Sequence, residues 1–289
     1  MKNVFLTLAL CVSLSGFAQI FNVGTIEKVN VERAKVAAIS PQGDYLLLTS
    51  SDNQGLAKYD LSTGATKTLS NAQGAGYDVK VSRDGQMVVY RENSYTATHL
   101  KNVSLKSANL ITGENALLVA PTRNLQGVGI EGKSVVAVNK GMATTKVATP
   151  VLSIQNRQLV MTLNGKTKVF SPNGKNTSYL WPSVSPDGTK VLYYVAGNGA
   201  YVCDLKGHHR VKVGTMRAPQ WYDNNTVIGM NDQDDGEFIY ASSIVAATLN
   251  GETQTLTDAT LVAMYPKAAS GKIAFSTPAG AVYIRNVTK

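Results

Sequence analysis

Cysteine and histidine are scarce in this sequence, which has two cysteines and three histidines in 289 residues. Cys11 lies in a segment that we expect to be removed, so the mature chain can form no internal disulfide and must be stabilised by its core. His208 and His209 are adjacent while His99 is distant, and neighbouring residues on a strand point to opposite faces, which disfavours a shared metal. No Gly-x-Ser-x-Gly motif is present, so nothing indicates a Ser/His/Asp hydrolase.

Charge is also sparse. Only 16% of the residues are charged, with 28 Lys and Arg against 19 Asp and Glu, a net charge of +9. There is no run of five Lys or Arg residues, so the basic stripe of a nucleic-acid-binding protein is missing and we expect no nucleic-acid partner. The dispersed positive excess favours acidic partners only weakly. A hydrophobic content of 44% is ample for a packed core.

Long hydrophobic runs are absent beyond the N-terminus, so we expect no transmembrane segment in the mature chain. The N-terminal "MKNVFLTLALCVSLSGFAQ" combines Lys2, an apolar stretch too short to span a bilayer and small residues before Gln19. This pattern predicts a signal peptide over residues 1–18, cleaved after Ala18, and a periplasmic or secreted protein. In "AYVCDL" we interpret Cys203 as a small buried hydrophobe on a strand; the alternative is a reactive thiol.

A repeated unit organises the rest of the chain. The segment "WPSVSPDGTKVLYYVAGNGAYVCDLKG" (181–207) is similar in sequence to 37–70 and 79–93. A more divergent copy lies at 218–257, and less similar copies occur elsewhere. Their turns align at six positions separated by 37 to 56 residues: Gly43, Gly85, Gly132, Gly188, Asn225 and Gly271. This spacing is typical of β-propeller blades.

Each copy reads as four short antiparallel strands, and long amphipathic helical patterns are absent. We therefore predict an all-β fold, a six-bladed β-propeller of four-stranded antiparallel blades, forming a single domain over 19–289. The last copy ends after its third strand, whereas "NVGTIEKVN" (22–30) is an unassigned strand near the N-terminus. We predict that this N-terminal strand completes the last blade and closes the ring without a covalent link.

The repeat resembles that of the TolB-like, WD40-like propellers. The likeness rests on Ser-Pro-Asp-Gly, on third strands ending in "DLKG" or "TLNG", on a final "TLT", and on "APQWYDNN" and "WPSVSPDG", which resemble the entry of that repeat. It implies an exported propeller. TolB proteins also carry an N-terminal α/β domain, for which the residues between Gln19 and the first repeat leave no room. The TolB partners, a peptidoglycan-associated lipoprotein and the Tol membrane complex, follow only from the resemblance.

A partner would bind where the inner strands begin, because these ends ring the central channel and share one face with the loops between second and third strands. Counting back from the turns predicts a polar and aromatic channel mouth of Lys35, Tyr77, Asp78, Asn124, Trp181 and Arg217. The loops add Arg91, Asn93, Asn198 and Asp232. Such a mouth suits an acidic peptide or a carboxylated glycan; the alternative is a set of ordinary solvated loop residues.

Acidic residues in the turns do not require chemistry. Asp84 and Asp187 stand directly before glycine, where hairpin turns favour Asp, so we interpret them as structural. The loop "NDQDDGEF" (231–238) could hold calcium, but it departs from the EF-hand order, and a solvated turn is the preferred interpretation. We expect no catalytic residue, cofactor or metal.

The sequence thus predicts an exported, monomeric, non-enzymatic propeller that binds an envelope protein or peptide, possibly an acidic one, through the channel face. The alternative is a propeller enzyme, a glycan lyase, hydrolase or lactonase, that uses the same channel mouth.

Overall fold

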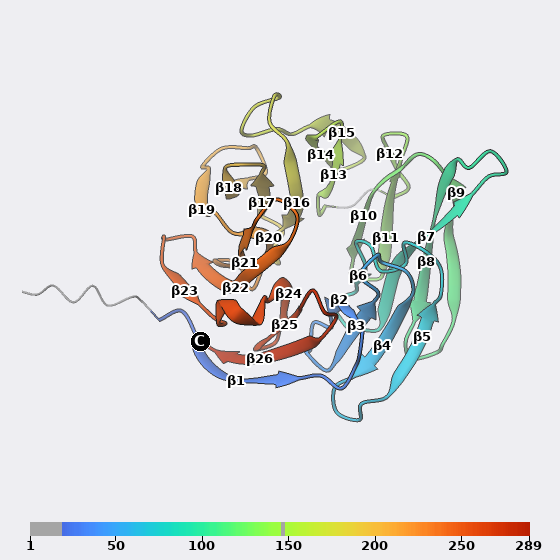
Figure 1. Ribbon diagram of the computed structural model, residues 1–289. Helices are drawn as coiled ribbons and strands as arrows, with labels where there is room; N and C mark the ends of the chain where they lie inside the picture. The colour runs from blue at the N-terminus through green and yellow to red at the C-terminus, as the bar shows by residue number, and fades with distance from the viewer. Residues whose placement is uncertain (1–18, 146–147) are drawn as a thin grey trace, which may run out of the picture.

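The computed structural model describes residues 19–145 and 148–289. These residues form seven antiparallel sheets arranged as blades around a common centre (Figure 1). Five sheets have four strands and two have three. The chain is therefore an all-β propeller, and the prediction of six four-stranded blades is wrong: a seventh blade lies between the turns at Gly132 and Gly188, which the six-blade prediction took as successive.

The strands follow each other outward from the centre in blades 1 to 6. The first four blades contain β2 (Lys35–Ile39), β3 (Tyr45–Thr49), β4 (Leu56–Asp60) and β5 (Thr66–Ser70); β6 (Lys80–Val81), β7 (Met87–Tyr95), β8 (Lys101–Asn109) and β9 (Asn115–Thr122); β10 (Leu125–Glu131), β11 (Ser134–Asn139) and β12 (Met142–Ala143); and β13 (Val151–Gln155), β14 (Gln158–Leu163) and β15 (Lys166–Val169). Blades 5 and 6 contain β16 (Tyr179–Val184), β17 (Lys190–Val195), β18 (Gly199–Asp204) and β19 (Val211–Gly214); and β20 (Arg217–Trp221), β21 (Thr226–Asp234), β22 (Ile239–Thr248) and β23 (Thr253–Thr255).

Blade 7 joins the two ends of the described chain. It is built from β24 (Met264–Ala269), β25 (Lys272–Ser276) and β26 (Val282–Thr288), with β1 (Asn22–Lys28) as its outer strand, and a 3-10 turn, η1 (Ala259–Leu261), precedes it. β1 pairs antiparallel with β26, from Asn22 opposite Thr288 to Lys28 opposite Tyr283. The predicted closure by the N-terminal strand is therefore confirmed.

The missed blade has no glycine in its first turn. Blade 4 turns between β13 and β14 at Asn156 and Arg157, whose φ angles are 51° and 65°. Two left-handed residues of this kind make the tight hairpin turn that Asn-Gly usually provides. Within 19–145 and 148–289, blades 3 and 4 have three strands each, so the 56 residues that separate Gly132 from Gly188 lead from the first turn of blade 3 past the whole of blade 4 to the first turn of blade 5.

The core is divided into seven clusters, one between each pair of neighbouring blades. Strand β3 shows how one strand serves two clusters. Leu46 and Leu48 pack toward blade 7, whereas Tyr45 and Leu47 pack toward blade 2. This explains why second strands are continuous apolar runs such as "YLLL" rather than alternating ones, since a strand buried on both faces needs apolar residues at every position.

The Ser-Pro-Asp-Gly turn of blade 5 and the Ser-Arg-Asp-Gly turn of blade 2 are held by their own side chains. In blade 5 the Ser185 hydroxyl donates to Asp187 at 2.5 Å and accepts the backbone N–H of Lys190 at 2.9 Å. The hydrogen bond from Ser185 is the main reason that the pKa of Asp187 falls to about 2. In blade 2, Ser82 and Asp84 make the same 2.5 Å bond. The acidic residue of the motif is thus part of the turn.

Cys203 lies on β18 in the core between blades 4 and 5, where it is 2% exposed. Burial raises the pKa of its thiol to about 12. We expect a thiol reagent to label Cys203 in the native chain beginning at Gln19 about a hundredfold more slowly than in the same chain in denaturant. Equal rates in a folded sample would mean that the thiol is reactive.

Candidate binding surface at the entry face

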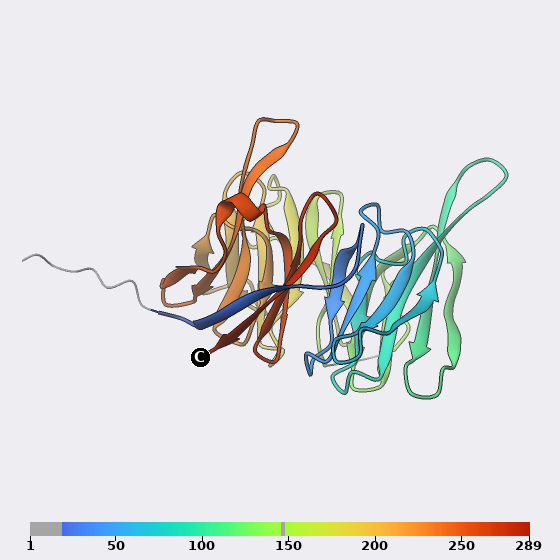
Figure 2. The same ribbon diagram turned by 60° about the horizontal axis from the view of Figure 1, so that its bottom comes forward.

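The ten predicted site residues all lie on one side of the ring. We call this side the entry face; it consists of the starts of the seven inner strands and of the hairpins that join second and third strands. Inner strands of neighbouring blades, such as β2 and β24, contact each other around the centre. Two hairpins of the entry face, β7–β8 and β21–β22, project well above the other loops on the same side (Figure 2).

Irregular backbone recurs where the inner strands begin. Four of them carry a non-glycine residue in the left-handed conformation: Asp78, Trp181, Ala218 and Tyr265, with φ between 46° and 52°. In β16, β20 and β24 the pairing register also shifts at this point. Non-glycine residues in this region carry strain and are concentrated at functional sites. The strain accordingly marks the entry face as a candidate site.

The predicted residues of blade 2 form one charge cluster. Asp78 accepts from Arg91 at 2.6 Å and from Lys80 at 2.5 Å, and the Arg91 guanidinium lies 5.6 Å from the centre of the Tyr77 ring. Desolvation acts to raise the pKa of Asp78, but the charges of Lys80 and Arg91 outweigh it and lower that pKa. Tyr77, Asp78 and Arg91, which the sequence presented as separate candidates, therefore act as a unit. Asn93, on the same hairpin, packs against Gly74.

Blade 6 has a similar ion pair, but the positions of the cation and the carboxylate are exchanged relative to blade 2. Here the cation is on the inner strand: Arg217 donates to Asp232 at 2.6 Å and lies 3.6 Å from Asp234. The side chain of Asp232 is only 2% exposed. In the same acidic loop, the Asp235 carboxylate accepts backbone N–H groups from Glu237 and Phe238. Within the described parts of the chain, no group of three or more His, Cys, Asp or Glu side chains is placed to hold a metal ion.

The remaining predicted residues are more dispersed. Lys35 donates to Asn53 at 2.7 Å and to the backbone of Ser51. Trp181 packs edge-on against Tyr194, with ring centres 5.3 Å apart. On the next hairpin, Asn198 accepts from Tyr201 and Lys212. Asn124 stands just before β10 and accepts the Lys140 N–H through its backbone carbonyl.

Exposed aromatic side chains gather on the entry face. Within the described ranges, the exposed aromatic residues are Tyr77, Tyr95, Phe238, Tyr240 and Tyr265. All five lie at inner-strand starts or on the two projecting hairpins. The sequence prediction included only Tyr77. The other four could have been noticed as aromatic residues in otherwise polar connections, "NSYTA", "GEFIY" and "AMYP", but the structure was needed to show that they lie on the same face as Tyr77.

Lys267 was also missed. It lies on β24, and its charge interacts with those of Lys80, Asp78 and Lys35. Lys267, Lys80 and Lys35 lie on the inner strands of blades 7, 2 and 1. Burial, together with the nearby positive charge of Lys80, lowers the pKa of Lys267 to about 8. No salt bridge or side-chain hydrogen bond of the described residues involves Lys267.

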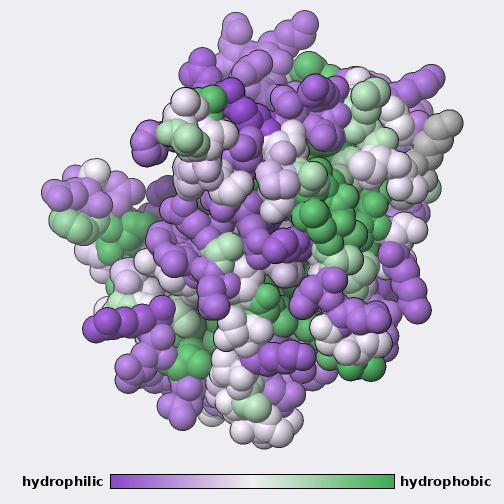
Figure 3. Space-filling view, turned by 90° about the vertical axis from the view of Figure 1, so that its right-hand side faces the viewer, coloured by the Kyte–Doolittle hydropathy of each residue, from purple (hydrophilic) through white to green (hydrophobic). Residues whose placement is uncertain are grey.

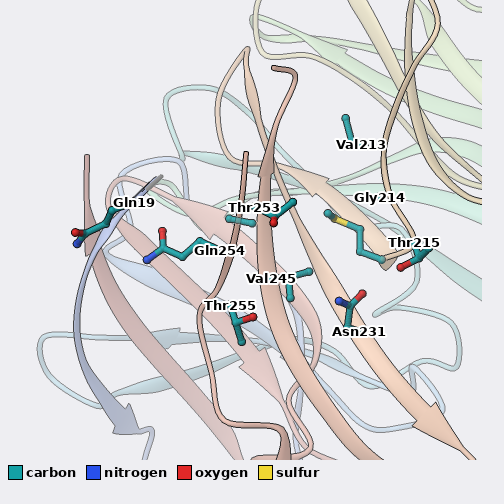
Figure 4. Close-up of a pocket in the computed structure, with 11 residues that line it drawn as sticks. Gln19, Val213, Gly214, Thr215, Asn231, Val245, Thr253, Gln254 and Thr255 are labelled. Atoms are coloured by element: carbon teal, nitrogen blue, oxygen red, sulfur yellow. The ribbon is translucent and has the colours of Figure 1, made fainter. Parts of the chain in front are cut away.

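A cavity of about 550 Å3 lies away from this centre, between blades 5 and 6 (Figure 4). Its walls are the end of β19 with Thr215 and Met216 just after it, and strands β21 to β23 of blade 6, which contribute Asn231 and Thr255 among others. Gln19 lies at its edge. The lining is mostly neutral polar and small apolar residues, and none of the predicted site residues contributes to it.

The side of the ring exposes aliphatic side chains, whereas the entry face exposes aromatic ones. The outer edge of blade 2 exposes Ile111, Leu117 and Leu118, which are aliphatic. From this side, apolar areas are interrupted by hydrophilic ones (Figure 3).

No helix in the described part of the chain has the length and apolarity needed to cross a membrane.

Comparison with known proteins supports the fold. No protein-family model and no curated protein sequence matches the chain. Among solved structures, virginiamycin B lyase from Staphylococcus aureus aligns with a TM-score of 0.62 and 12% identity, covering 93% of this chain and 100% of that chain. The Cps50 (Swd1) β-propeller domain from Myceliophteria thermophila gives 0.59 and 12%, covering 91% and 100%. A putative TolB from Agrobacterium tumefaciens gives 0.55 and 14%, covering 89% and 91%.

These similarities define the class of the protein, a seven-bladed β-propeller with TolB-like and WD40-type structural neighbours. The resemblance to TolB-like repeats is confirmed at the level of the fold. Identities this low establish nothing about activity, and the neighbours include a lyase as well as a TolB-type protein.

Proposed function

We propose that this protein is an exported, non-enzymatic propeller that binds a protein or peptide in the cell envelope through its entry face. The observation that carries the proposal is the concentration of all five exposed aromatic side chains of the described residues on that face. Aromatic residues are enriched in binding hot spots because they bury a large area at small entropic cost. Export rests on the N-terminal sequence pattern.

The arrangement of charge supports the same proposal. Arg91 and Arg217 are already paired with Asp78 and Asp232. These pairs are preformed, and Arg91, Arg217 and Asp232 lie on strands while Asp78 is two residues before β6, so a partner would meet a fixed pattern of charge, which favours specificity. The two projecting hairpins would contact a partner on opposite sides of the ring centre, in keeping with an extended surface rather than a single deep pocket (Figures 1 and 2).

A capture experiment tests this function. The substitutions Tyr95→Ser, Phe238→Ser and Tyr240→Ser remove three exposed aromatic side chains, and because these groups are exposed, the fold should be unaffected. The matched control is Ile111→Ser with Leu117→Ser, which removes exposed apolar groups from the outer edge of blade 2. Wild type and control should capture the same envelope protein, and the entry-face variant should lose it.

The captured partner, once purified, allows a quantitative check. Truncating a hot-spot aromatic residue costs about 2 kcal/mol or more, so the triple variant should raise Kd at least about thirtyfold in a calorimetric titration. Equal affinity for wild type and entry-face variant would contradict the proposal. Turnover of an acidic oligosaccharide or lactone by the wild-type protein would instead support the alternative, a propeller enzyme.

A further inference from the structure

One continuous part of the chain carries most of the net positive charge. Residues 132–186 contain seven Lys and Arg and no Asp or Glu, so this segment has a net charge of +7, against +9 for the whole chain. The segment includes β11 to β16, and therefore the whole of blade 4. A concentration of one sign of charge on neighbouring blades favours an acidic partner there.

The outer strand of blade 4, β15, has an open edge. Among the described residues it pairs with β14 alone, as the last of three strands. The Phe170 N–H donates to the Leu159 carbonyl at 2.7 Å, on the β14 side. Successive residues of an antiparallel strand direct their backbone groups to alternate sides, so those of Thr167 and Val169 point away from β14. Val169 is 52% exposed, and its backbone can pair with a further strand.

Three exposed lysines lie at this edge. Lys166 and Lys168 occupy alternate positions of β15, so their side chains share one face of the sheet. The Thr167 hydroxyl donates to the Gly141 carbonyl of blade 3 at 2.6 Å, and this contact brings Lys140, the residue before Gly141, close to the same edge. No salt bridge between described residues involves any of the three lysines.

The lysines decide which kind of strand fits this edge. Antiparallel pairing of β15 with a second copy of itself, centred on Thr167 or Lys168, would place a lysine opposite a lysine, and like charges in that position destabilise a sheet. A strand with acidic residues at alternate positions would instead place carboxylates opposite lysines. Blade 7 shows that a segment distant in sequence can serve as an outer strand, because β1 pairs with β26 there.

We propose that the outer edge of blade 4 binds an extended segment of a partner protein with acidic residues at alternate positions, and that this segment becomes the fourth strand of the blade. Its carboxylates pair with Lys166 and Lys168, and its backbone forms hydrogen bonds with Thr167 and Val169. The site uses none of the exposed aromatic residues of the entry face, so the inference does not rest on the proposed function.

Titration of the 15N-labelled protein with blocked peptides, followed by NMR, tests strand addition. The probe is acetyl-Val-Glu-Thr-Glu-Val-Glu-Thr-amide, which should shift the amide signals of Thr167 and Val169. Acetyl-Val-Glu-Pro-Glu-Pro-Glu-Thr-amide has the same charge but lacks two of the N–H groups that would pair with β15, so it should bind about tenfold more weakly or less. Equal binding of the proline peptide would show attraction by charge alone, and no shift with the first peptide would exclude the site; either result overturns the proposal.

A charge reversal assigns the binding to the two lysines. The variant with Lys166→Glu and Lys168→Glu alters exposed side chains, so it should fold normally, bind the acidic peptide about tenfold more weakly or less, and gain binding of acetyl-Val-Lys-Thr-Lys-Val-Lys-Thr-amide. The matched control is Lys67→Glu, an exposed lysine on β5, the outer strand of blade 1, and it should bind the acidic peptide as wild type does. Wild-type affinity of the double variant for the acidic peptide would show that Lys166 and Lys168 do not bind it, and would refute the proposal.

Discussion

Deleting residues 20–31 should leave the protein unfolded at ordinary temperatures, because this segment supplies the outer strand of blade 7 and part of two interblade cores. Phe21 is completely buried, and Ile20 and Val29 are nearly so. Phe21 packs edge-on against Tyr222 with ring centres 4.5 Å apart, and its backbone exchanges hydrogen bonds with the Gln254 side chain at 2.7 Å and 2.9 Å. The segment thus joins blade 6 as well as completing blade 7.

The size of the effect follows from burial. Each large apolar side chain removed from a core is worth roughly 1.5–3 kcal/mol, and the β1–β26 hydrogen bonds are lost with them, which is comparable with the whole stability of a typical domain. A milder substitution, Phe21→Ala, should cost about 4 kcal/mol and lower Tm by about 10 °C. Val23→Ala, at an exposed position of β1, is the matched control and should change Tm little. An unchanged Tm in the deletion variant would refute closure by the N-terminal strand.

The chain ends strengthen this closure. Lys289 lies 5.9 Å from the ring centres of both Phe21 and Tyr222 and pairs with Asp223 on blade 6. The last residue of the chain and the first strand therefore cover the same junction between blades 6 and 7.

How much of the fold the sequence reveals depends on how each blade makes its first turn. Ser-Pro-Asp-Gly in blade 5 and Ser-Arg-Asp-Gly in blade 2 are recognisable because hairpin turns favour Asp followed by Gly, and they located these two blades directly. The Asn156–Arg157 turn also reverses the chain between the first and second strands, but it does so with two non-glycine residues in the left-handed conformation. Nothing in the sequence indicates that conformation at these two positions. Blade 4 also has only three strands among the described residues. The distance between successive first turns is therefore shorter there than in a four-stranded repeat, and the blade was missed.

The positions of the candidate site residues could be predicted from the sequence, but their ion pairs and charge interactions with one another could not. Counting from the turns led to Lys35 and Arg217, which are the first residues of β2 and β20, and to Asp78, which is two residues before β6. Pairing of Arg217 with Asp232 depends on strand register within blade 6, where Arg217 lies opposite Met230 and the register shifts between Arg217 and Gln220. Lys267 could not be identified at all from "YPKAAS", because its environment is made by residues about 190 and 230 positions earlier in the chain, Lys80 and Lys35.

The paired arginines also affect how the entry face should be probed. Replacing Arg217 with glutamate would bring a like charge against Asp232, whose side chain is 2% exposed, and would leave that carboxylate buried without its partner. Breaking such a pair is strongly destabilising. Loss of binding in this variant would therefore mix folding with recognition, whereas the exposed aromatic residues can be truncated without that complication.

Replacing Lys267 with methionine should stabilise the protein, and the gain should depend on pH. In the folded state burial and Lys80 lower the pKa of Lys267 to about 8, against an ordinary value of 10.5. Below pH 8 the lysine is charged in both states, and the folded state carries the full cost. Between pH 8 and 10.5 the unfolded chain binds more protons than the folded one, so wild-type stability contributed by this group rises with pH.

The lowered pKa corresponds to about 3 kcal/mol. Lys267→Met should therefore be about 3 kcal/mol more stable than wild type near pH 7, and the difference should shrink to near zero above pH 10.5. Urea denaturation at a series of pH values measures it, with Lys272→Met as a control that should show no such pH dependence. A variant less stable than wild type at pH 7 would mean that Lys267 is compensated within the protein. A stabilising loss of Lys267 would instead show that the inner strand of blade 7 keeps an unfavourable charge.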